Sequence, residues 1–311
     1  MRHYNWSMND STTNAYQPLH HSTSDFIQIR GLRYHVRRWG STAADAPPVW
    51  LLHGWMDVSA SYQFLADELL KLRPNIALYA PDWRGFGLTD APTPCDAYWF
   101  ADYLGDLDAL LKHYHQDAAI DLVAHSMGGN ASMIYAGVRP ERIKHLVNLD
   151  GLGLADTQAE QAPKRYAKWL DELTETVEFA PHTNAAGVAA RLMKNNPRLP
   201  LDKAQFLAPH WAAEAPDGRW HIQGDPAHKR TNPVLYRLPE VLACWAAITA
   251  PVLVIEPASL STRTWLKVTD MDVRLGKLAS YRHCLIEDAG HMLHHDQPQK
   301  LAVEMVAHCG W

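Results

Sequence analysis

One short stretch near the middle of the chain limits the possible folds more than any other. Residues 120–129 read IDLVAHSMGG, an apolar run typical of a buried strand that is followed at once by small residues. A strand that turns directly into a helix leaves little room at its corner, so the side chains there must be small. Ala124 and Gly128 stand on either side of Ser126. The stretch therefore predicts a tight strand–turn–helix junction with the hydroxyl of Ser126 exposed at its apex.

The serine at this junction has the surroundings of a catalytic nucleophile. The motif for such a nucleophile elbow is written G-x-S-x-G, and here Ala124 replaces the first glycine with one extra methyl group. A buried junction with an incidental serine would carry the same residues, because short motifs also occur by chance. The interpretation of Ser126 as a nucleophile therefore depends on partners elsewhere in the chain.

Segments typical of strands and helices alternate along most of the chain. Apolar runs predict the strands, and apolar residues at helical spacing predict the helices between them. The strands are expected at residues 26–30, 32–39, 49–52, 76–80, 120–125, 144–149, 252–255 and 282–286. The helices are expected at residues 61–72, 98–115, 127–138, 238–247, 264–279 and 298–308. This alternation predicts an α/β fold: a mostly parallel central sheet, with an antiparallel first pair of strands and helices on both faces.

The alternation stops between about residues 154 and 232, after the sixth expected strand. This stretch reads as several short helices. Because ligands of α/β sheets bind beyond the carboxyl ends of the strands, we expect residues 154–232 to form a helical cap there. The core domain then comprises residues 25–153 and 233–311. Residues 1–24, rich in Asn, Ser, Thr and His, are expected to form a flexible N-terminal arm.

The overall composition narrows the partners that the protein can have. Of the 311 residues, 47% are hydrophobic and 20% charged, the balance of a globular chain with a large core. A formal charge of −5, with no dense run of Lys or Arg, argues against nucleic acid as a partner. No stretch approaches the roughly 18 consecutive apolar residues that a membrane span requires. A small molecule is the expected partner, and a homodimer is left open.

The cysteines and the N-terminal segment favour the cytoplasm. Cys95, Cys244, Cys284 and Cys309 are scattered without C-x-x-C spacing, which suits a reducing compartment better than a disulfide framework. Residues 1–24 lack the basic-then-apolar layout of a secretory signal. We therefore expect a cytoplasmic location.

No metal or organic cofactor is expected. The pairs His20-His21 and His294-His295 lie in no zinc-binding pattern such as H-E-x-x-H, and the sequence shows no second cluster of ligands. Neither a Rossmann nor a P-loop glycine pattern occurs. Chemistry by side chains alone is the expectation.

A serine hydroxyl is a weak nucleophile at neutral pH unless a base takes its proton, and histidine is the usual base. Among the eighteen histidines, His291 stands out because it lies in the loop after the last expected strand. From there it can reach across the sheet edge toward Ser126, and Gly290 beside it permits a tight turn. His294 and His295 are alternative bases, although their expected place is the approach to the last helix.

Attack on a carbonyl creates an oxyanion that needs hydrogen-bond donors already in place. The backbone N–H of Met127, at the start of the helix after the serine, is the first candidate. The second is the N–H of Trp55 in the run His53-Gly54-Trp55-Met56, where Gly54 permits a close approach. The same run would also suit a simple turn at the end of a strand.

Four motifs in this order resemble the α/β-hydrolase superfamily over roughly residues 26–311. They are His53-Gly54-Trp55, Asp82-Trp83-Arg84-Gly85-Phe86-Gly87 with Asp90, the Ser126 elbow, and Gly290-His291-Met292 followed by Asp296-Gln297-Pro298. The resemblance implies the α/β-hydrolase fold and a serine, an acid and a histidine in that chain order, without a cofactor. It also implies that residues 82–87 are mainly architectural. Haloalkane dehalogenases and epoxide hydrolases of the superfamily carry an aspartate at the elbow, so the resemblance sets them apart from this chain.

The acid is the part of the pattern that this chain changes. Relatives commonly carry Gly-x-x-Asp after the strand that corresponds to residues 252–255, but here the loop reads EPASLS and has no aspartate. Asp150, after the strand expected at residues 144–149, is favoured as the acid, because some lipases and dehalogenases of the superfamily use that position. Glu256 is an alternative, and another is that no acid reaches His291. As a purely structural residue, Asp150 would cap the end of its strand.

These residues predict a serine hydrolase that cleaves carboxylic esters of small to medium apolar groups through an acyl-enzyme. Ser126 is the expected nucleophile, His291 the base and Asp150 the acid, with the oxyanion hole formed by Trp55 and Met127. The same triad would serve hydrolysis of C–C bonds or thioesters, or acyl transfer. A hydrolase-like binding protein with little turnover is a further alternative, because loss of the acid alone can lower the rate by about 10⁴.

Overall fold

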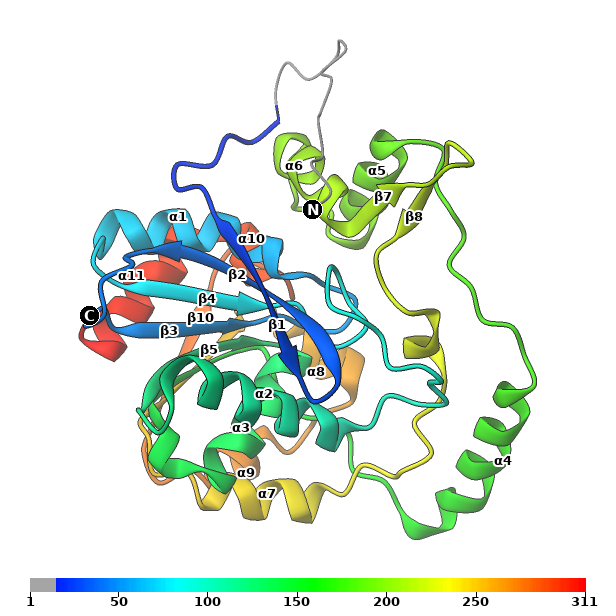
Figure 1. Cartoon of the computed structure of the whole chain (residues 1–311). Helices are drawn as coiled ribbons and strands as arrows, with labels where there is room; N and C mark the ends of the chain where they lie inside the picture. Colours follow the sequence, from blue (N-terminus) through cyan, green and yellow to red (C-terminus); the bar gives the residue numbers. More distant parts are fainter. Residues whose placement is uncertain (1–14) are drawn as a thin grey trace.

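An eight-stranded sheet forms the centre of the protein, whose computed structural model describes residues 15–311 (Figure 1). The strands lie in the order β1-β2-β4-β3-β5-β6-β9-β10. β2 pairs in antiparallel fashion with β1 and β4, and all further pairs are parallel, so the expected sheet is confirmed. The bounds are β1 Thr23–Ile29, β2 Leu32–Gly40, β3 Pro48–Leu52, β4 Ala77–Pro81, β5 Ile120–His125, β6 Ile143–Leu149, β9 Val252–Pro257 and β10 Tyr281–Ile286.

Helices cover both faces of the sheet, as expected. Because successive side chains of a strand point to opposite faces, each central strand contributes to two apolar cores. In β3, Val49 and Leu51 belong to one core, and Trp50 and Leu52 belong to the other. The helices of the first core are α1 (Gln63–Leu72) and α11 (Pro298–Cys309), and those of the second are α2 (Phe100–His115), α3 (Met127–Val138) and α7 (Leu238–Ala246).

The single helix expected at residues 264–279 is wrong. The structure has two short helices there, α8 (Ser261–Leu266) and α9 (Met271–Leu275). Lys267 has a φ of 56°, in the left-handed region, and therefore ends α8. The β-branched Val268 and Thr269 follow and disfavour an immediate restart of the helix.

Residues 154–232 are inserted between β6 and β9 and are mainly helical. They contain α4 (Ala162–Leu173), α5 (Ala185–Asn195) and α6 (Leu201–Trp211). In Figure 1 this inserted segment extends from the top of the view, at α6 and α5, to the right, at α4, and the arrows of β3 and β4 point to the right. Helices α5 and α6 share a small apolar core to which Phe64 of α1 contributes. That the inserted segment acts as a cap stays a prediction.

The inserted segment also contains a short hairpin, where only short helices were expected. It consists of β7 (Ala212–Glu214) and β8 (Trp220–Ile222), which pair in antiparallel fashion. Gly218 in its turn has a φ of 75°, which glycine adopts readily. The run Pro216-Asp217-Gly218 was the available signal, because these residue types favour turns.

Part of the segment expected to form a flexible N-terminal arm, residues 15–24, packs against the core domain instead. Residues 1–14 lie outside the described part of the chain, and β1 already begins at Thr23. Between them, the Tyr16 hydroxyl donates a hydrogen bond of 2.7 Å to the buried carboxylate of Asp67. The Tyr16 ring lies 4.8 Å from that of Phe64. A buried acceptor and an aromatic contact therefore fix residues that composition alone assigned to an arm.

Two expectations from composition bear on the described residues. All four cysteines are free thiols. No helix within residues 15–311 has the length and apolar character needed to cross a bilayer. The cytoplasmic location and the homodimer stay predictions.

Candidate active site

Ser126 lies at the corner between β5 and α3, where the motif predicts it. Its φ is 51°, in the left-handed region, and α3 begins at the next residue. The corner is crowded, because a Cβ atom on Gly128 would lie 2.5 Å from the carbonyl oxygen of Leu52. A Cβ atom on Gly54 would lie 3.0 Å from Cβ of Ser126. Small residues are therefore required around the serine, which itself stays partly exposed.

His291 reaches this serine from the loop after β10. Its Nε2 atom lies 3.0 Å from Oγ of Ser126. Two hydrogen bonds hold the loop: the Gly290 N–H donates to the Asp296 carboxylate at 2.8 Å, and Nε2 of His125 donates to the His291 carbonyl at 2.7 Å. His125 was not predicted as a site residue, because nothing in its position within a strand indicated this contact.

The alternative bases His294 and His295 are buried in α10 (Leu293–Asp296). Their Nε2 atoms both contact the Ser61 hydroxyl, and Asp57 lies 3.5 Å from Nε2 of His294. Asp57, His294 and His295 form a group of side chains that could bind a metal ion. The Nδ1 atoms of the two histidines have no hydrogen-bond partner among the described residues. Imidazoles that bind a metal normally donate that second N–H, so the group carries no metal assignment. A second group of this type consists of Asp121, His145 and Cys309.

Asp150 contacts His291 from the opposite side. It directly follows β6, has a φ of 54°, and places its Oδ2 atom 2.7 Å from Nδ1 of His291. The hydroxyl of Thr262, in α8, donates a hydrogen bond of 2.5 Å to the same oxygen. Burial raises the pKa of Asp150, and the hydrogen bond with His291 partly opposes that rise. Thr262 was missed, because it lies just before the helix expected at residues 264–279, where a threonine gives no signal of such a contact.

Glu256, the alternative acid, is occupied elsewhere. Arg263 donates hydrogen bonds of 2.7 and 2.5 Å to its two carboxylate oxygens. Nε2 of His283 lies 2.8 Å from one of these oxygens. The carboxylate is fully buried among these partners. Of the two acids considered, Asp150 is therefore the one that contacts His291.

A buried asparagine fixes the turn that carries Asp150. The Asn148 side chain accepts a hydrogen bond of 2.8 Å from the Gly151 N–H and donates one of 2.9 Å to its carbonyl. The Asp150 N–H donates to the carbonyl of Ile255 in β9 at 2.8 Å. A Cβ atom on Gly151 would lie 2.8 Å from Cα of Gly129, so this crossing requires glycine. The carboxylate therefore projects from a rigid turn.

The two candidate oxyanion donors lie on the segments that flank Ser126. Met127 is the first residue of α3, and its N–H points out of the helix rather than to a helical carbonyl. Trp55 follows Gly54, whose backbone approaches the serine. Within residues 15–311, neither backbone N–H has a hydrogen-bond partner. Both donors are therefore free to bind an oxyanion.

The loop at residues 82–87 has the contacts of a structural element. The Arg84 guanidinium donates to both oxygens of Asp106, at 2.6 and 2.7 Å. Asp82 accepts hydrogen bonds from two backbone N–H groups and lies 2.7 Å from Nδ1 of His35. Burial raises the pKa of Asp82, but His35 and the N–H donors outweigh it and hold that pKa far below its usual value. These contacts therefore fix the conformation of the loop.

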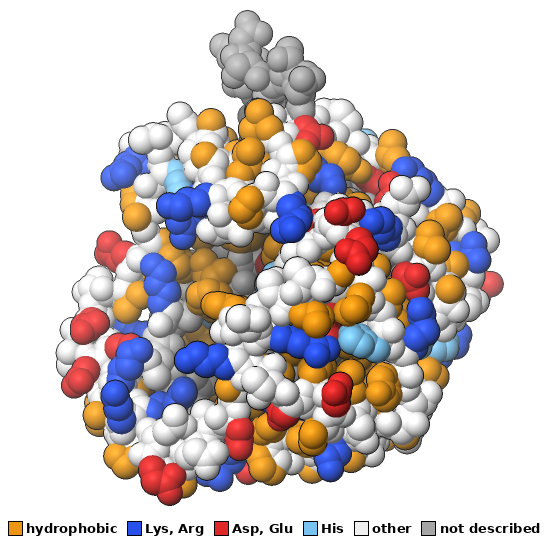
Figure 2. All heavy atoms as spheres, turned by 180° about the vertical axis from the view of Figure 1, so that it is seen from behind, with side chains coloured by type: hydrophobic (Ala, Val, Ile, Leu, Met, Phe, Trp, Pro, Cys, Tyr) orange, Lys and Arg blue, Asp and Glu red, His pale blue; other side chains and the backbone are white. Residues whose placement is uncertain are grey.

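Two exposed tryptophans stand at the rim of the site. Trp265 is 73% exposed, and its ring lies 6.4 Å from that of His291. Trp55, on the loop of the oxyanion donor, is 54% exposed. Figure 2 shows a hollow with hydrophobic side chains on its wall, on the side of the molecule that the inserted segment occupies. An exposed indole ring therefore lies beside His291, and Lys and Arg side chains surround the hollow in Figure 2.

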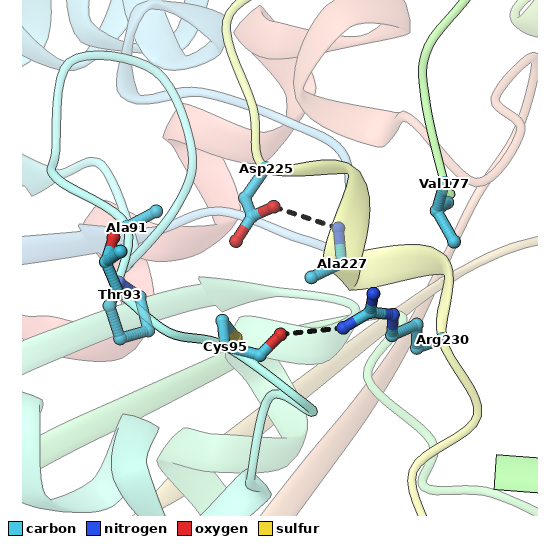
Figure 3. A pocket seen from close by; sticks show the side chains of 8 residues that line it. Ala91, Thr93, Cys95, Val177, Asp225, Ala227 and Arg230 are labelled. Atoms are coloured by element: carbon cyan, nitrogen blue, oxygen red, sulfur yellow. Dashed lines mark hydrogen bonds between the residues drawn. The ribbon is translucent and has the colours of Figure 1, made fainter. Parts of the chain in front are cut away.

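A separate cavity of about 280 Å³ lies between residues 91–95 and η4 (Pro226–Lys229) (Figure 3). Asp225 accepts a hydrogen bond from a backbone N–H of η4, and Nη1 of Arg230 donates to the Cys95 carbonyl, whereas the buried Nε of Arg230 has no partner among the described residues. None of the predicted catalytic residues lines this cavity.

Comparison with known proteins agrees with the fold described above. Residues 47–298 match the model of the alpha/beta hydrolase fold family. The chain is 32% identical over 255 residues to a serine hydrolase-like protein of Danio rerio, with 78% of this chain and 76% of that protein covered. It is 35% identical over 134 residues to epoxide hydrolase 2 of Siraitia grosvenorii, where the match covers 43% of this chain and only 39% of that protein.

Solved structures share the architecture over nearly the whole chain. The thioesterase domain from the curacin biosynthetic pathway has a TM-score of 0.82 and 23% sequence identity, with 92% of this chain and 99% of that chain covered. A likeness at this identity shows the fold alone. Because the family match spans most of the chain, the protein belongs to the alpha/beta hydrolase fold family.

Proposed function

We propose that this protein is a serine hydrolase that cleaves carboxylic esters. The observation that carries the proposal is the unbroken line of contacts from the Ser126 hydroxyl through the His291 imidazole to the Asp150 carboxylate, at 3.0 and 2.7 Å. These side chains come from three distant parts of the chain and meet in the order nucleophile, base and acid. Membership of the alpha/beta hydrolase fold family supports the same function.

In the first half of the reaction, Nε2 of His291 takes the proton of the Ser126 hydroxyl while Oγ attacks the ester carbonyl carbon. One electron pair of the carbonyl double bond moves to its oxygen, and the N–H groups of Met127 and Trp55 bind the resulting oxyanion. The pair then returns, the bond to the alcohol oxygen breaks, and the alcohol leaves with the proton from His291. An acyl-enzyme on Ser126 remains.

In the second half, water attacks the acyl carbon and gives its proton to His291. The carboxylic acid leaves, and the proton returns to Oγ of Ser126. Asp150 keeps the Nδ1–H of His291 directed at its own Oδ2, which leaves Nε2 as the acceptor, and its charge stabilises the imidazolium. Thr262 holds that carboxylate in place through its hydrogen bond to Oδ2.

Esters with small to medium apolar groups are the proposed substrates. The exposed indoles of Trp55 and Trp265 support this choice. We assign the inserted segment the role of a cap over this end of the sheet. The epoxide hydrolase relatives do not change the proposal, because this chain carries Ser126 rather than an aspartate at the elbow. Thioesters and C–C bonds are the alternatives that a substrate panel separates.

The test compares the wild-type protein with Ser126→Ala on p-nitrophenyl acetate, butyrate and octanoate and on matched thioesters. We expect the substitution to lower kcat by at least about 10⁴-fold and to abolish labelling by a fluorophosphonate. Ser132→Ala is the matched control, because Ser132 is a buried serine of α3, the helix that follows Ser126, and its hydroxyl donates to the Gly128 carbonyl. Turnover by Ser126→Ala at the wild-type rate would refute the proposal.

A further inference from the structure

His125 has no part in the reaction above, yet it contacts three segments of the site. It directly precedes Ser126, and its Nε2 atom lies 2.7 Å from the carbonyl oxygen of His291. Its ring centre is 4.6 Å from that of the His291 ring. A Cβ atom on Gly54, next to Trp55, would lie 3.0 Å from Nδ1 of His125. One imidazole therefore joins the nucleophile, the base and the oxyanion loop.

These contacts determine where the proton of the His125 ring lies. A backbone carbonyl only accepts hydrogen bonds, so Nε2 must carry the hydrogen. Burial lowers the pKa of His125 far below its ordinary value, and the charges of His291 and His294 act in the same direction. The ring is therefore neutral, and its Nδ1 carries no proton. Within residues 15–311, that buried Nδ1 has no hydrogen-bond partner.

The hydrogen bond from His125 is also the main restraint on the backbone of His291. Among the described residues, neither the N–H nor the carbonyl of His291 makes any other hydrogen bond. The neighbouring bond from Gly290 to Asp296 holds the loop one residue earlier. Loss of the His125 donor would therefore free the peptide that carries the base.

The imidazole of His125 is itself held in place by the ring of His294. The ring of His294 lies 4.7 Å from it and stacks on Tyr62 at 4.9 Å. Nε2 of His294 lies 3.0 Å from the Ser61 hydroxyl. A donor clamped in this way keeps one direction, which a flexible side chain would not.

We propose that His125 is a positioning residue for the proposed hydrolysis: its Nε2–H sets the distance between the imidazole of His291 and the hydroxyl of Ser126. The inference rests on the proposed function. Because His125 is buried and acts through His291, its loss should lower kcat and leave KM nearly unchanged. A displacement of about 1 Å at a reacting group lowers the rate by roughly 100-fold, so that is the decrease we expect.

The test uses two substitutions that separate the ring from the donor. His125→Phe keeps a planar ring but removes the N–H, and His125→Gln removes the ring but keeps an amide N–H at similar reach. We expect His125→Phe to lower both kcat and the rate of fluorophosphonate labelling by roughly 100-fold, and His125→Gln to restore most of that loss. The control is His145→Phe. His145 lies in β6 opposite Asp121, at the amino-terminal end of the strands and therefore away from Ser126, so this variant should retain wild-type kcat.

Two outcomes would overturn the inference without touching the proposed function. One is wild-type kcat in His125→Phe while Ser126→Ala is inactive. The other is an equal loss in His125→Gln and His125→Phe when circular dichroism shows both folded, because packing rather than the donor would then be responsible. Full activity of Ser126→Ala would instead refute the proposed function itself.

Discussion

Asp150→Asn is the substitution that tests the site most sharply, because it changes a proton position and almost no volume. Oδ1 of Asp150 is buried without a partner among the described residues, whereas Oδ2 meets both His291 and Thr262. An amide placed with its nitrogen at the Oδ1 position would bury an unpaired donor, at a cost of about 1–3 kcal/mol. The nitrogen is therefore expected at the Oδ2 position, where it faces Nδ1 of His291 and the Thr262 hydroxyl can turn to accept.

In that orientation the new amide donates to Nδ1 of His291, so the neutral ring must carry its own proton on Nε2. The ring then donates toward Ser126 and cannot take the serine proton. The same exchange in a serine protease lowers kcat by about 10⁴-fold. In the opposite orientation the amide oxygen faces Nδ1 of His291, so the productive tautomer of that ring is kept. This orientation is populated about 5- to 150-fold less, and it lacks the negative charge of the carboxylate. We therefore expect kcat to fall by between about 10² and 10⁴-fold.

The assay is steady-state hydrolysis of p-nitrophenyl butyrate by Asp150→Asn and by Glu256→Gln, well below the melting temperature of each. Glu256→Gln weakens the buried pair with Arg263 and should lower the melting temperature, but kcat per folded molecule should stay near that of wild type. A loss of activity in Glu256→Gln as large as that in Asp150→Asn would contradict the assignment of the acid. So would a decrease of less than about tenfold in Asp150→Asn.

Three further predictions concern stability. Gly128→Ala places a methyl group 2.5 Å from a backbone carbonyl oxygen and should lower the unfolding free energy by about 1–3 kcal/mol. In the control Gly187→Ala, in α5, the methyl group meets nothing nearer than 3.6 Å, so the melting temperature should rise slightly. Thermal denaturation compares the two variants. Asp106→Asn removes the buried charge that Arg84 meets at 2.6 Å, and urea unfolding should show a loss of about 3–5 kcal/mol. Burial lowers the pKa of His228 from 6.5 to about 3, so below pH 6.5 the unfolded chain binds a proton that the folded chain does not. Stability should then fall by about 1.4 kcal/mol per pH unit as the pH drops toward 3, and urea titrations of His228→Gln should lack this part of the decrease.

The fold could be predicted because its signals are local. The apolar run of β5 and the small residues around Ser126 lie within ten consecutive positions. Leucine spacing in α2 and the single apolar run of β3 are likewise visible without tertiary contacts. The failure at residues 264–279 has the same origin, because apolar spacing continued across Lys267, whose left-handed backbone only the folded chain reveals.

The contacts of the site could be predicted only in part. Loop order along the chain indicated that His291 reaches Ser126, but the choice between Asp150 and Glu256 depended on distances in space. Glu256 forms an ion pair with Arg263, seven residues away, and no sequence motif predicts that pair. The contact between His125 and His291 joins residues 166 positions apart, and no local sequence pattern predicts it either.

The left-handed backbones of Ser126 and Asp150 set a limit on how far this protein can be stabilised. In this conformation any residue other than glycine loses about 1–3 kcal/mol of stability. The two residues directly follow adjacent strands, β5 and β6. Glycine at either position would relieve this penalty, and Ser126→Gly should melt at a higher temperature than wild type while losing its hydrolytic activity. A selection for thermal tolerance alone would therefore tend to discard the proposed nucleophile, and the proposed hydrolysis would persist only where the chemistry itself is selected.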